Sequence, residues 1–404
     1  MKILFLGYAI NEKDIQNIIG SSVAGNKMQL NILENLSSYS DIEIHILTIY
    51  PIASYAKSKK IYINRKNLNI SDRLTALRVP FLNVSIVKQI WQVVSLYREG
   101  KKYLKDNKDV LLFTFNMFPQ VGIPAKWLKK FFKCKIVTLL ADLPVDFVDN
   151  RRGLNKLLRS IYYKITKNNI NFCDQIIVLN KKASEIYAPS TNSIVVEGGI
   201  NVENISNYDK RKHIKTNKSI LYGGFLTEYN GIKNLVDAMF FIQDNQVTLD
   251  IYGEGPLEKY VIENAKKDKR IVYHGKVNNK EMIKLQKEAF LLINPRNPEY
   301  FISQVTFPSK IFEYLASGTP ILSTLLNCFT EEYLDKMFFV ENNKSEILAK
   351  AIEKILKKDQ KELDELAYRA REFVFKEKSW KKQTQKIYLF LKSTYKEGYF
   401  DEKE

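Results

Sequence analysis

Short, almost uninterrupted apolar runs alternate along the chain with longer segments in which apolar residues recur every three or four positions. Runs of the first kind are typical of parallel strands buried on both faces, and segments of the second kind are typical of amphipathic helices. In the N-terminal half the pattern predicts strands at 2–6, 42–49, 110–115, 135–141 and 173–180. It predicts helices between residue 25 and residue 36, at 85–105 and at 151–169, and it leaves 50–84 irregular and basic. The helix at 85–105 has apolar residues on one side, namely Ile86, Ile90, Val93, Val94 and Tyr97.

The C-terminal half repeats this alternation, and its first three strands end in glycine-bearing turns. A chain of 404 residues exceeds what one hydrophobic core usually serves, so two domains are expected. The fold class predicted is α/β, with two Rossmann-like, doubly wound domains. We place them at 1–200 and 219–378, joined by a polar linker at 201–218 and followed by a terminal helix at 379–404.

The net charge of +18 is concentrated in the N-terminal half. Residues 1–205 carry 29 Lys and Arg against 16 Asp and Glu, whereas the remainder carries 34 against 29. An anionic membrane face, a diphosphate-bearing acceptor or nucleic acid would each explain such a balance. No nucleic-acid-binding motif is present, so we rank nucleic acid last and expect none as a partner.

The cysteines and the ends of the chain narrow the class of protein further. Cys134, Cys173 and Cys328 are too few and too scattered for a disulfide framework or a zinc site, which fits a cytoplasmic protein. The N-terminus resembles a first strand rather than a signal peptide, and no run of 18 apolar residues predicts a transmembrane helix. The D-x-D motif of metal-dependent sugar transfer is absent, so no metal is expected.

The segment 306–324 carries the clearest candidate chemistry. Pro308 suits the first position of a helix, and Ser309 and Lys310 follow it, so backbone N–H groups, a hydroxyl and an ammonium meet at one helix start. Glu313, one turn later, could accept hydrogen bonds from a diol. Phosphate and diol side by side describe a nucleotide. A solvated glutamate and a surface lysine would give the same spacing, and the residues alone leave both interpretations open.

The run Pro-Ser-Lys-Ile-Phe-Glu-Tyr-Leu-Ala-Ser-Gly-Thr-Pro-Ile-Leu at 308–322 resembles the signature of the bacterial retaining glycosyltransferases of family 4, also called group 1. That resemblance implies the GT-B arrangement of two Rossmann-like domains, with a terminal helix that crosses back to the first. It implies no cofactor, a nucleotide-diphosphate sugar as co-substrate, and Glu313 on the donor ribose. Candidate donor-binding residues by the same resemblance are Gly223, Gly224, Gly253, Gly275, Val277, Ser309, Lys310 and Glu313.

Three positions depart from the family pattern. Phe225 and Asn230 stand where the family has an arginine and a lysine for the diphosphate, so Lys310, with Lys233 as a weaker candidate, is expected to supply that charge. Val305 stands where many members have a second glutamate for the transferred sugar. The side chains nearest to this position that could replace the glutamate are Arg296, Glu299 and Gln304.

The acceptor side is expected in the N-terminal half. Gly20 and Gly25 are candidates for close approach to a ligand, although isolated glycines are also common in plain turns. Asp142 comes directly after a predicted strand and is a candidate catalytic residue for the acceptor hydroxyl, together with Lys310 for the leaving group; Asp142 could also cap the next segment. The helix at 151–169 is basic and amphipathic, and it could either lie on a membrane or pack into its own domain.

The sequence therefore predicts a retaining glycosyltransferase of the hexosyltransferase type that takes a nucleotide sugar and a saccharide acceptor. The expected acceptor is polyprenyl-diphosphate-linked, in bacterial capsule or other surface polysaccharide synthesis, with the enzyme cytoplasmic and peripheral on the inner membrane face. Two alternatives remain, a nucleotide-sugar epimerase of the same fold and a non-catalytic, membrane-associated relative. The donor base, the sugar, the linkage and the oligomeric state cannot be read from the sequence.

Overall fold

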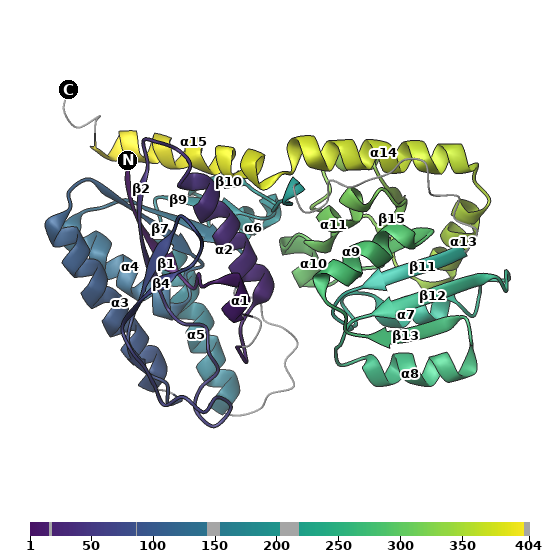
Figure 1. Cartoon of the computed structure of the whole chain (residues 1–404), viewed down its shortest axis with the longest axis horizontal. Helices are drawn as coiled ribbons and strands as arrows, with labels where there is room; N and C mark the ends of the chain where they lie inside the picture. The colour runs from purple at the N-terminus through teal and green to yellow at the C-terminus, as the bar shows by residue number, and fades with distance from the viewer. Residues whose placement is uncertain (16–17, 86, 144–153, 203–217, 400–404) are drawn as a thin grey trace. The chain divides into compact units, whose positions relative to one another are not determined.

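The computed structural model describes residues 1–15, 18–85, 87–143, 154–202 and 218–399 (Figure 1). These residues form two compact units. Unit 1 comprises Met1–Glu197 together with Trp380–Glu404, and unit 2 comprises Gly198–Ser379. The division thus falls three residues before the expected end of the first domain and one residue into the expected terminal helix. The expected linker lies mostly outside the described residues.

Unit 1 contains an eight-stranded sheet among its described residues, in the order β10-β9-β8-β7-β1-β2-β5-β4. All its pairings are parallel except that of β4 with β5. The strands are β1 (Lys2–Gly7), β2 (Glu43–Thr48), β4 (Lys66–Asn69), β5 (Thr75–Arg78), β7 (Val110–Phe115), β8 (Ile136–Leu140), β9 (Gln175–Val178) and β10 (Asn192–Val195). A separate antiparallel pair is formed by β3 (Tyr62–Ile63) and β6 (Phe81–Leu82). The central strands are buried on both faces, as their uninterrupted apolar sequences predict.

The segment 50–84 corrects the sequence-based expectation of an irregular excursion. It contains four short strands, and β5 extends the main sheet by pairing with β2. These strands are only two to four residues long, too short to show either an apolar run or a clean alternation in the sequence.

Helices cover both faces of this sheet. The connection from β1 to β2 and the connection from β7 to β8 run in opposite directions along the sheet. Because such connections are right-handed, their helices lie on opposite faces. On one face α3 packs on α4 and α4 packs on α5, and on the other α15 packs on α2. The helices of unit 1 are α1 (Glu12–Ile15), α2 (Val23–Leu36), α3 (Val87–Asp106), α4 (Pro119–Phe132), α5 (Leu154–Ile170), α6 (Lys181–Tyr187) and α15 (Trp380–Tyr399).

The terminal helix α15 belongs to the core of unit 1. Trp380, Ile387, Phe390 and Leu391 are buried in the same cluster as Phe5 of β1. Lys392 of this helix also pairs with Asp41, with Nζ 2.9 Å from the carboxylate. The last helix therefore completes the domain that the first strand begins.

The orientation of α3 differs from the predicted one. Val93 is buried, but Ile90 is 64% exposed and Val94 is also exposed, while Leu96 and Leu104 point inward instead. The buried side of α3 includes Gln92, Ser95, Glu99 and Gly100, so polar and small residues face the domain while part of the apolar stripe faces solvent. Ile86 lies outside the described residues.

Unit 2 contains a six-stranded, all-parallel sheet among its described residues, in the order β13-β12-β11-β14-β15-β16. Its strands are β11 (Lys218–Gly223), β12 (Val247–Tyr252), β13 (Ile271–Gly275), β14 (Leu291–Asn294), β15 (Ile321–Thr324) and β16 (Phe338–Val340). Its helices are α7 (Ile232–Ala238), α8 (Glu258–Lys267), α9 (Asn279–Glu288), α10 (Phe301–Val305), α11 (Lys310–Ser317), α12 (Glu331–Leu334), α13 (Ser345–Leu356) and α14 (Gln360–Glu377).

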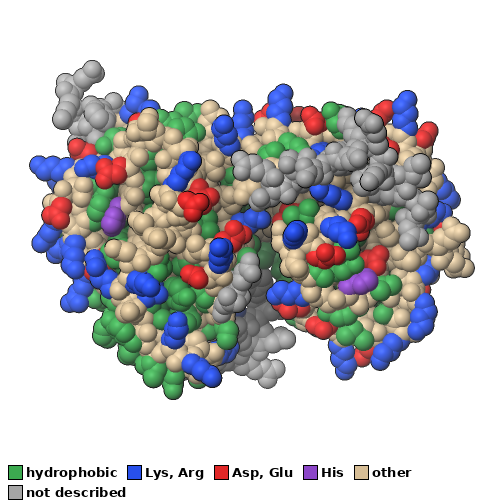
Figure 2. Space-filling model, viewed as in Figure 1, with side chains coloured by type: hydrophobic (Ala, Val, Ile, Leu, Met, Phe, Trp, Pro, Cys, Tyr) green, Lys and Arg blue, Asp and Glu red, His purple; other side chains and the backbone are tan. Residues whose placement is uncertain are grey.

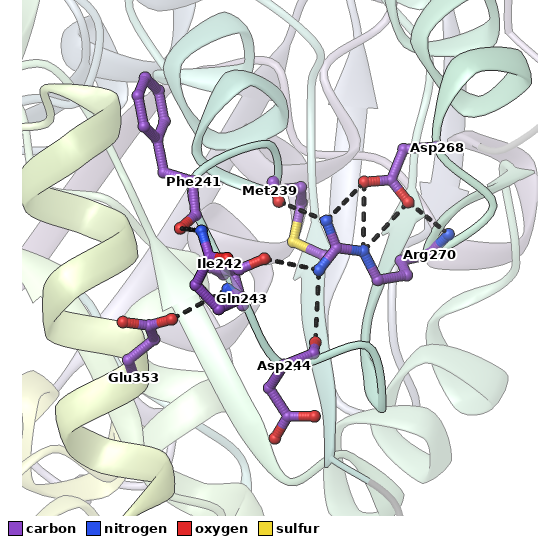
Figure 3. Close-up of polar contacts among 8 residues, drawn as sticks. All are labelled: Met239, Phe241, Ile242, Gln243, Asp244, Asp268, Arg270 and Glu353. Carbon is purple, nitrogen blue, oxygen red and sulfur yellow. Dashed lines mark hydrogen bonds and ion pairs between the residues drawn. The ribbon is translucent and has the colours of Figure 1, made fainter.

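Arg270 fixes the amino end of this sheet (Figure 3). Its guanidinium pairs with Asp268 at 2.7 Å and donates to the backbone carbonyls of Met239 and Ile242 at 2.7 and 2.8 Å. Such charge-assisted hydrogen bonds satisfy carbonyls near the end of α7 that the helix itself leaves open. These contacts connect the start of β13 to the segment after α7, at the edge of the sheet opposite the carboxyl ends of its strands.

Candidate functional site

The sheet of unit 2 reverses its direction of winding between β11 and β14, which are neighbours in the sheet. In open α/β sheets, ligands bind just beyond the carboxyl ends of the strands at such a reversal. Gly223 and Gly224 stand at the end of β11, and Arg296 follows β14 by two residues. Gly223 and Gly224, two of the predicted donor-binding residues, therefore lie where a doubly wound sheet binds ligands.

The turns at Gly224, Gly253 and Gly275 follow three neighbouring strands and lie side by side at this end of the sheet. The N–H of Gly224 donates to the carbonyl of Tyr252 at 2.9 Å, and the N–H of Gly253 donates to the carbonyl of Gly275 at 2.8 Å. Gly253 has a φ of +135°, and a Cβ at this position would lie 1.9 Å from the carbonyl oxygen of Gly224. No other residue fits there, because both the backbone angle and the available space exclude a side chain. The result is a shelf of half-buried backbone, without side chains at Gly224, Gly253 and Gly275, that a ligand can approach closely.

Lys310 lies beside this shelf. The residue as a whole is half-buried, but its ammonium group is fully buried, 3.9 Å from the ring centroid of Tyr222. A Cβ at Gly224 would lie 3.6 Å from its Nζ. Among the described residues this Nζ has no hydrogen-bond partner. Burial, aided by the positive charge of Arg296, holds the pKa of Lys310 well below its usual value. A buried, unpaired ammonium is costly, so an anion bound here would be strongly stabilised.

The start of α11 differs by two residues from the predicted start. Pro308 was expected at the first helical position, but the helix begins at Lys310 and Ser309 is its N-cap. The N–H groups of Ile311 and Phe312 donate to the carbonyls of Pro308 and Ser309, at 2.9 and 3.3 Å, in a tight first turn. Ser309 is exposed, and its hydroxyl makes no capping bond. The hydroxyl at the helix start is therefore directed to solvent, where a ligand could use it.

Glu313 lies in the first turn of α11, half-buried, and faces the start of α9. The side-chain amide of Asn279 donates to its carboxylate at 3.2 Å. Val277 is half-buried and lies two residues before Asn279, just after the turn at Gly275. Gly275 has a φ of +70°, and the position of its missing Cβ is open. The carboxylate and the turn after β13 thus border the same edge of the unit.

The departures from the family pattern have clear local structures. Phe225 is 52% exposed, and its carbonyl accepts hydrogen bonds from the Tyr222 hydroxyl and the Asn230 side chain, at 3.1 and 2.8 Å. Asn230 therefore closes the loop rather than supplying charge. Val305 is buried at the end of α10 and cannot contact a sugar. Glu299 is exposed.

Arg296 gains an importance that the sequence did not reveal. Its guanidinium is buried and donates to the hydroxyls of Ser303 and Thr306, at 3.0 and 2.7 Å. These bonds tie the end of β14 to α10, and they place a second cation close enough to Lys310 to lower the pKa of that lysine. In the sequence, Arg296 is visible only as a charged residue near the end of a predicted buried strand. The spacing between Arg296 and Lys310 does not predict that the two side chains lie close together.

Tyr222 and Tyr314 pack against the glycine shelf from the interior of the unit. The sequence did not indicate either residue. Both side chains are fully buried. The N–H of Gly223 donates to the Tyr314 hydroxyl at 3.0 Å, and the Tyr222 ring forms the surface over which the Lys310 ammonium lies. Two large aromatic residues therefore fix the positions of the turn and of the cation.

Unit 1 has a cavity of about 370 Å³ at the carboxyl edge of its sheet. This volume is within the range of about 300–1,000 Å³ that small-molecule sites occupy. The cavity is lined by side-chain amides, namely Asn26, Gln29, Gln89, Gln92, Asn116 and Gln120. Aromatic rings line it as well, namely Tyr8, Tyr50, Phe115, Phe118 and Tyr162. Among the described residues that line it, only Lys88 and Asp142 carry charge.

Asp142 is held at the wall of this cavity by Asn116, which follows β7. The Asn116 side-chain carbonyl accepts from the N–H groups of Ala141 and Asp142, at 2.8 and 2.9 Å, and its amide donates to the Asp142 carboxylate at 3.1 Å. Asp142 is accessible from the cavity, yet the surrounding protein atoms exclude enough water to raise the pKa of its carboxyl. A carboxylate so positioned can accept a hydrogen bond or a proton from a bound hydroxyl.

The other expected acceptor-side residues also line this cavity. Gly20 has a φ of +84° in the turn before α2. Gly25 was expected in the loop but lies in the first turn of α2, where its N–H donates to the Ser22 hydroxyl at 3.1 Å. Ser22 thus caps the helix that the sequence placed two residues later. Lys88, which the sequence analysis did not select, is half-buried, and burial lowers its pKa.

The described residues offer neither a metal site nor a membrane-spanning helix. Across residues 1–15, 18–85, 87–143, 154–202 and 218–399, no three His, Cys, Asp or Glu side chains gather as a metal site. Within the same ranges no helix has the length and apolarity needed to cross a bilayer. The basic helix predicted at 151–169 is α5, Leu154–Ile170, and the first two residues of the predicted range, Arg151 and Arg152, lie outside the described part of the chain.

Part of unit 2 matches a known family. Residues 217–358 match the model of the family described as "Glycosyl transferases group 1". No sequence of a curated protein matches the chain.

Several solved structures resemble the whole chain. Sucrose-phosphate synthase from Thermosynechococcus elongatus is 16% identical with a TM-score of 0.70, over 97% of this chain and 99% of that one. Anabaena HepE in complex with UDP-glucose is 14% identical with a TM-score of 0.65, over 97% and 100%. WaaG, a glycosyltransferase involved in lipopolysaccharide biosynthesis, is 13% identical with a TM-score of 0.64, over 96% and 99%. Identities this low speak for the fold alone.

Proposed function

We propose that this chain, which has the GT-B fold and carries a group 1 glycosyltransferase domain at residues 217–358, transfers a sugar from a nucleotide-diphosphate donor to a saccharide acceptor. Unit 2 binds the donor and unit 1 binds the acceptor. The observation that carries the proposal is the buried, unpaired ammonium of Lys310 beside the glycine shelf. A diphosphate is the anion that such a place suits, because glycine turns admit its oxygens and the lysine neutralises them.

In this proposal Glu313 binds the ribose diol of the donor. Its carboxylate is one turn from the helix start and next to the turn after β13, where Val277 would contact the base. Ser309 and the start of α11 face the diphosphate. Since Anabaena HepE was solved with UDP and with UDP-glucose, UDP-glucose is the first donor to test.

The acceptor occupies the cavity of unit 1. Amides that can donate and accept, together with aromatic rings, are suited to an uncharged saccharide, whose hydroxyls need both kinds of partner. Asp142 orients the acceptor hydroxyl. We assign to Lys88, the cation among the lining residues, the role of binding the phosphate of a lipid-linked acceptor.

Cleavage of the bond between sugar and diphosphate leaves negative charge on the leaving group. Lys310 and the start of α11 stabilise that charge in the transition state. The anomeric configuration is retained, and the departing diphosphate helps to remove the acceptor proton. The reaction needs no metal and no bound cofactor.

The biological setting we infer is bacterial surface polysaccharide synthesis by a family 4 enzyme at the cytoplasmic face of the membrane. The motive is the excess of 29 basic over 16 acidic residues in 1–205, which suits an anionic membrane and a polyprenyl-diphosphate-linked acceptor. Capsule synthesis is the specific form of this proposal.

The test begins with nucleotide binding. UDP, GDP and their sugars are compared by thermal stabilisation of the protein, and a shift with one nucleotide class is expected. Indifference to every nucleotide would reject donor binding and leave the non-catalytic alternative. The donor that binds is then incubated without acceptor, where a transferase hydrolyses it at most slowly and an epimerase converts its sugar.

A further inference from the structure

Three neighbouring helices of unit 1 expose large apolar side chains to solvent. α4 packs between α3 and α5, and each of the three contributes. Ile90 is 64% exposed and Leu157 is 57% exposed, values far above those of core residues. The set, which we name the apolar face, consists of Val87, Ile90, Trp91, Val94, Trp127, Leu157, Leu158 and Ile161. On α3 and on α5 these residues recur every three or four positions, so each of the two helices presents an apolar stripe to solvent. Large exposed apolar surfaces mark interaction sites, whereas single exposed apolar residues are common anywhere.

The charges of these three helices are mostly positive. The three helices, 87–106, 119–132 and 154–170, carry twelve Lys and Arg against two Asp and Glu. One of those two acids, Glu99, is buried and already paired with Arg65 and Lys102, at 3.2 and 3.1 Å. Lys129 is also paired, with Asp174 at 2.7 Å, and Lys88 lines the cavity. Lys130, Lys156 and Lys164 are exposed and can face an external anionic surface. Figure 2 shows hydrophobic side chains gathered at the lower end of unit 1, with blue lysines and arginines around them.

We propose that the apolar face inserts into the interface of an anionic lipid bilayer. Two of the three tryptophans of the chain, Trp91 and Trp127, lie in it, and tryptophan is the residue that membrane interfaces prefer. Leucine and isoleucine beside lysine give an interfacial surface its apolar contact and its attraction to anionic lipid. This inference rests on the proposed function, because it names the surface from which a lipid-linked acceptor would reach the enzyme.

The two sides of α3 explain why this surface suits the acceptor. Lys88, Gln89 and Gln92 line the cavity of unit 1, while Ile90, Trp91 and Val94 point to solvent from the same helix. α5 repeats the arrangement, since Tyr162 lines the cavity and Leu158 and Ile161 are exposed. A saccharide in the cavity would therefore lie one helix diameter from the bilayer that holds its lipid.

The experiment measures binding of the whole chain to vesicles by flotation, with phosphatidylcholine alone and with added phosphatidylglycerol. Wild-type protein is expected to float with the anionic vesicles. Ile90→Ser and Leu157→Ser are expected to lower the partition coefficient by about tenfold each, because each removes one large apolar side chain from the interface. Leu389→Ser is the matched control, since Leu389 is 58% exposed on α15 of the same unit and its change should have no effect.

Tryptophan fluorescence gives a second measurement. Brominated lipids should quench Trp91 and Trp127 but not Trp380, which is buried. Absence of binding to anionic vesicles, or binding that neither Ile90→Ser nor Leu157→Ser weakens, would overturn the proposal. So would a dimer in sedimentation that Ile90→Ser dissociates, because the face would then join two copies. Nucleotide-induced stabilisation of the same variants is measured in parallel, so a failure of donor binding is distinguishable from a failure of membrane docking.

Discussion

The ammonium of Lys310 lies 3.9 Å from the centroid of the Tyr222 ring and has no hydrogen-bond partner among the described residues. The Tyr222 ring offers this charge a cation–π contact, which is worth about 0.5–2 kcal/mol and does not replace a full hydrogen-bonding shell. The free protein therefore holds a destabilised cation at the edge of a glycine turn. Such a cost is typical of a site prepared for an anion.

Replacing Lys310 by Met should separate stability from function. The variant loses a buried, unpaired charge, so the unliganded protein is expected to melt higher, by about 2–4 °C for each kcal/mol gained in a domain of this size. Nucleotide-induced stabilisation should disappear. Differential scanning calorimetry with and without UDP measures both. Lys259→Met, at an exposed lysine of α8, is the control and should retain the nucleotide effect. A Lys310→Met protein that melts lower and still responds to UDP would contradict this account.

Nucleotide binding should take up a proton above the pKa of Lys310 in the free protein. Burial lowers that pKa, and a bound diphosphate raises it by stabilising the ammonium. Affinity is therefore highest below the pKa of the free protein and falls as pH rises from there to the pKa of the complex. Calorimetry in two buffers of different ionisation enthalpy measures the uptake. Lys310→Met should show none, and a pH-independent affinity in the wild type across the alkaline range would count against the assignment.

Glu313→Ala should weaken binding of a nucleoside diphosphate by about 10- to 150-fold, the value of a lost hydrogen bond to a charged group. Titration calorimetry gives the affinity directly. Glu281→Ala is a matched control, because Glu281 is an exposed glutamate in the first turn of the neighbouring helix α9. Inorganic pyrophosphate, which has no ribose, should bind the wild-type protein and the Glu313→Ala variant equally. Equal losses for UDP and pyrophosphate would show that Glu313 acts on something other than the diol.

Asp142→Asn should reduce transfer by about 10²–10⁴-fold, the usual contribution of a positioned acid or base, and leave nucleotide binding intact. Asp106→Asn, at the exposed end of α3, should have no effect. Steady-state kinetics with the identified donor measures the loss. If the variant keeps its full rate, the carboxylate only fixes the turn after β8.

The raised pKa of Asp142 also predicts how stability depends on pH. Because its pKa is higher in the folded than in the unfolded protein, the folded state binds this proton more tightly. The contribution of this group to the free energy of unfolding is therefore full below the unfolded-state pKa. It is lost as pH rises through the folded-state pKa. Asp142→Asn should remove this dependence and melt at the same temperature as wild type or higher at pH 7, in thermal scans across pH.

Lys88→Gln should discriminate between acceptors. Lys88 is a charged residue of a cavity otherwise lined mainly by amides and aromatic rings, so its loss should raise the KM for a diphosphate-linked acceptor more than for the same saccharide without phosphate. Lys102→Gln, at an exposed lysine of the same helix, is the control. A uniform effect on both acceptors would place the phosphate elsewhere.

The sequence by itself determined the features that depend on neighbouring residues. Apolar runs specified the central strands, as at Phe5 and Phe113, because a strand buried on both faces needs no polar position. Gly318 ended α11 in the left-handed conformation that glycine alone adopts freely. The glycine turns at Gly224 and Gly253 were visible for the same reason.

Only the tertiary structure decided which side of α3 is buried and which charges meet. Ile90 and Val94 form an apolar stripe with helical spacing, and they are exposed. Periodicity shows that apolar residues share one side of a helix, but it does not show whether that side faces the core or solvent. Arg296 lies in the loop after β14 and Lys310 at the start of α11, fourteen positions later, so their proximity arises from tertiary packing. Burial of an ammonium is a property of that packing, and no local pattern encodes it.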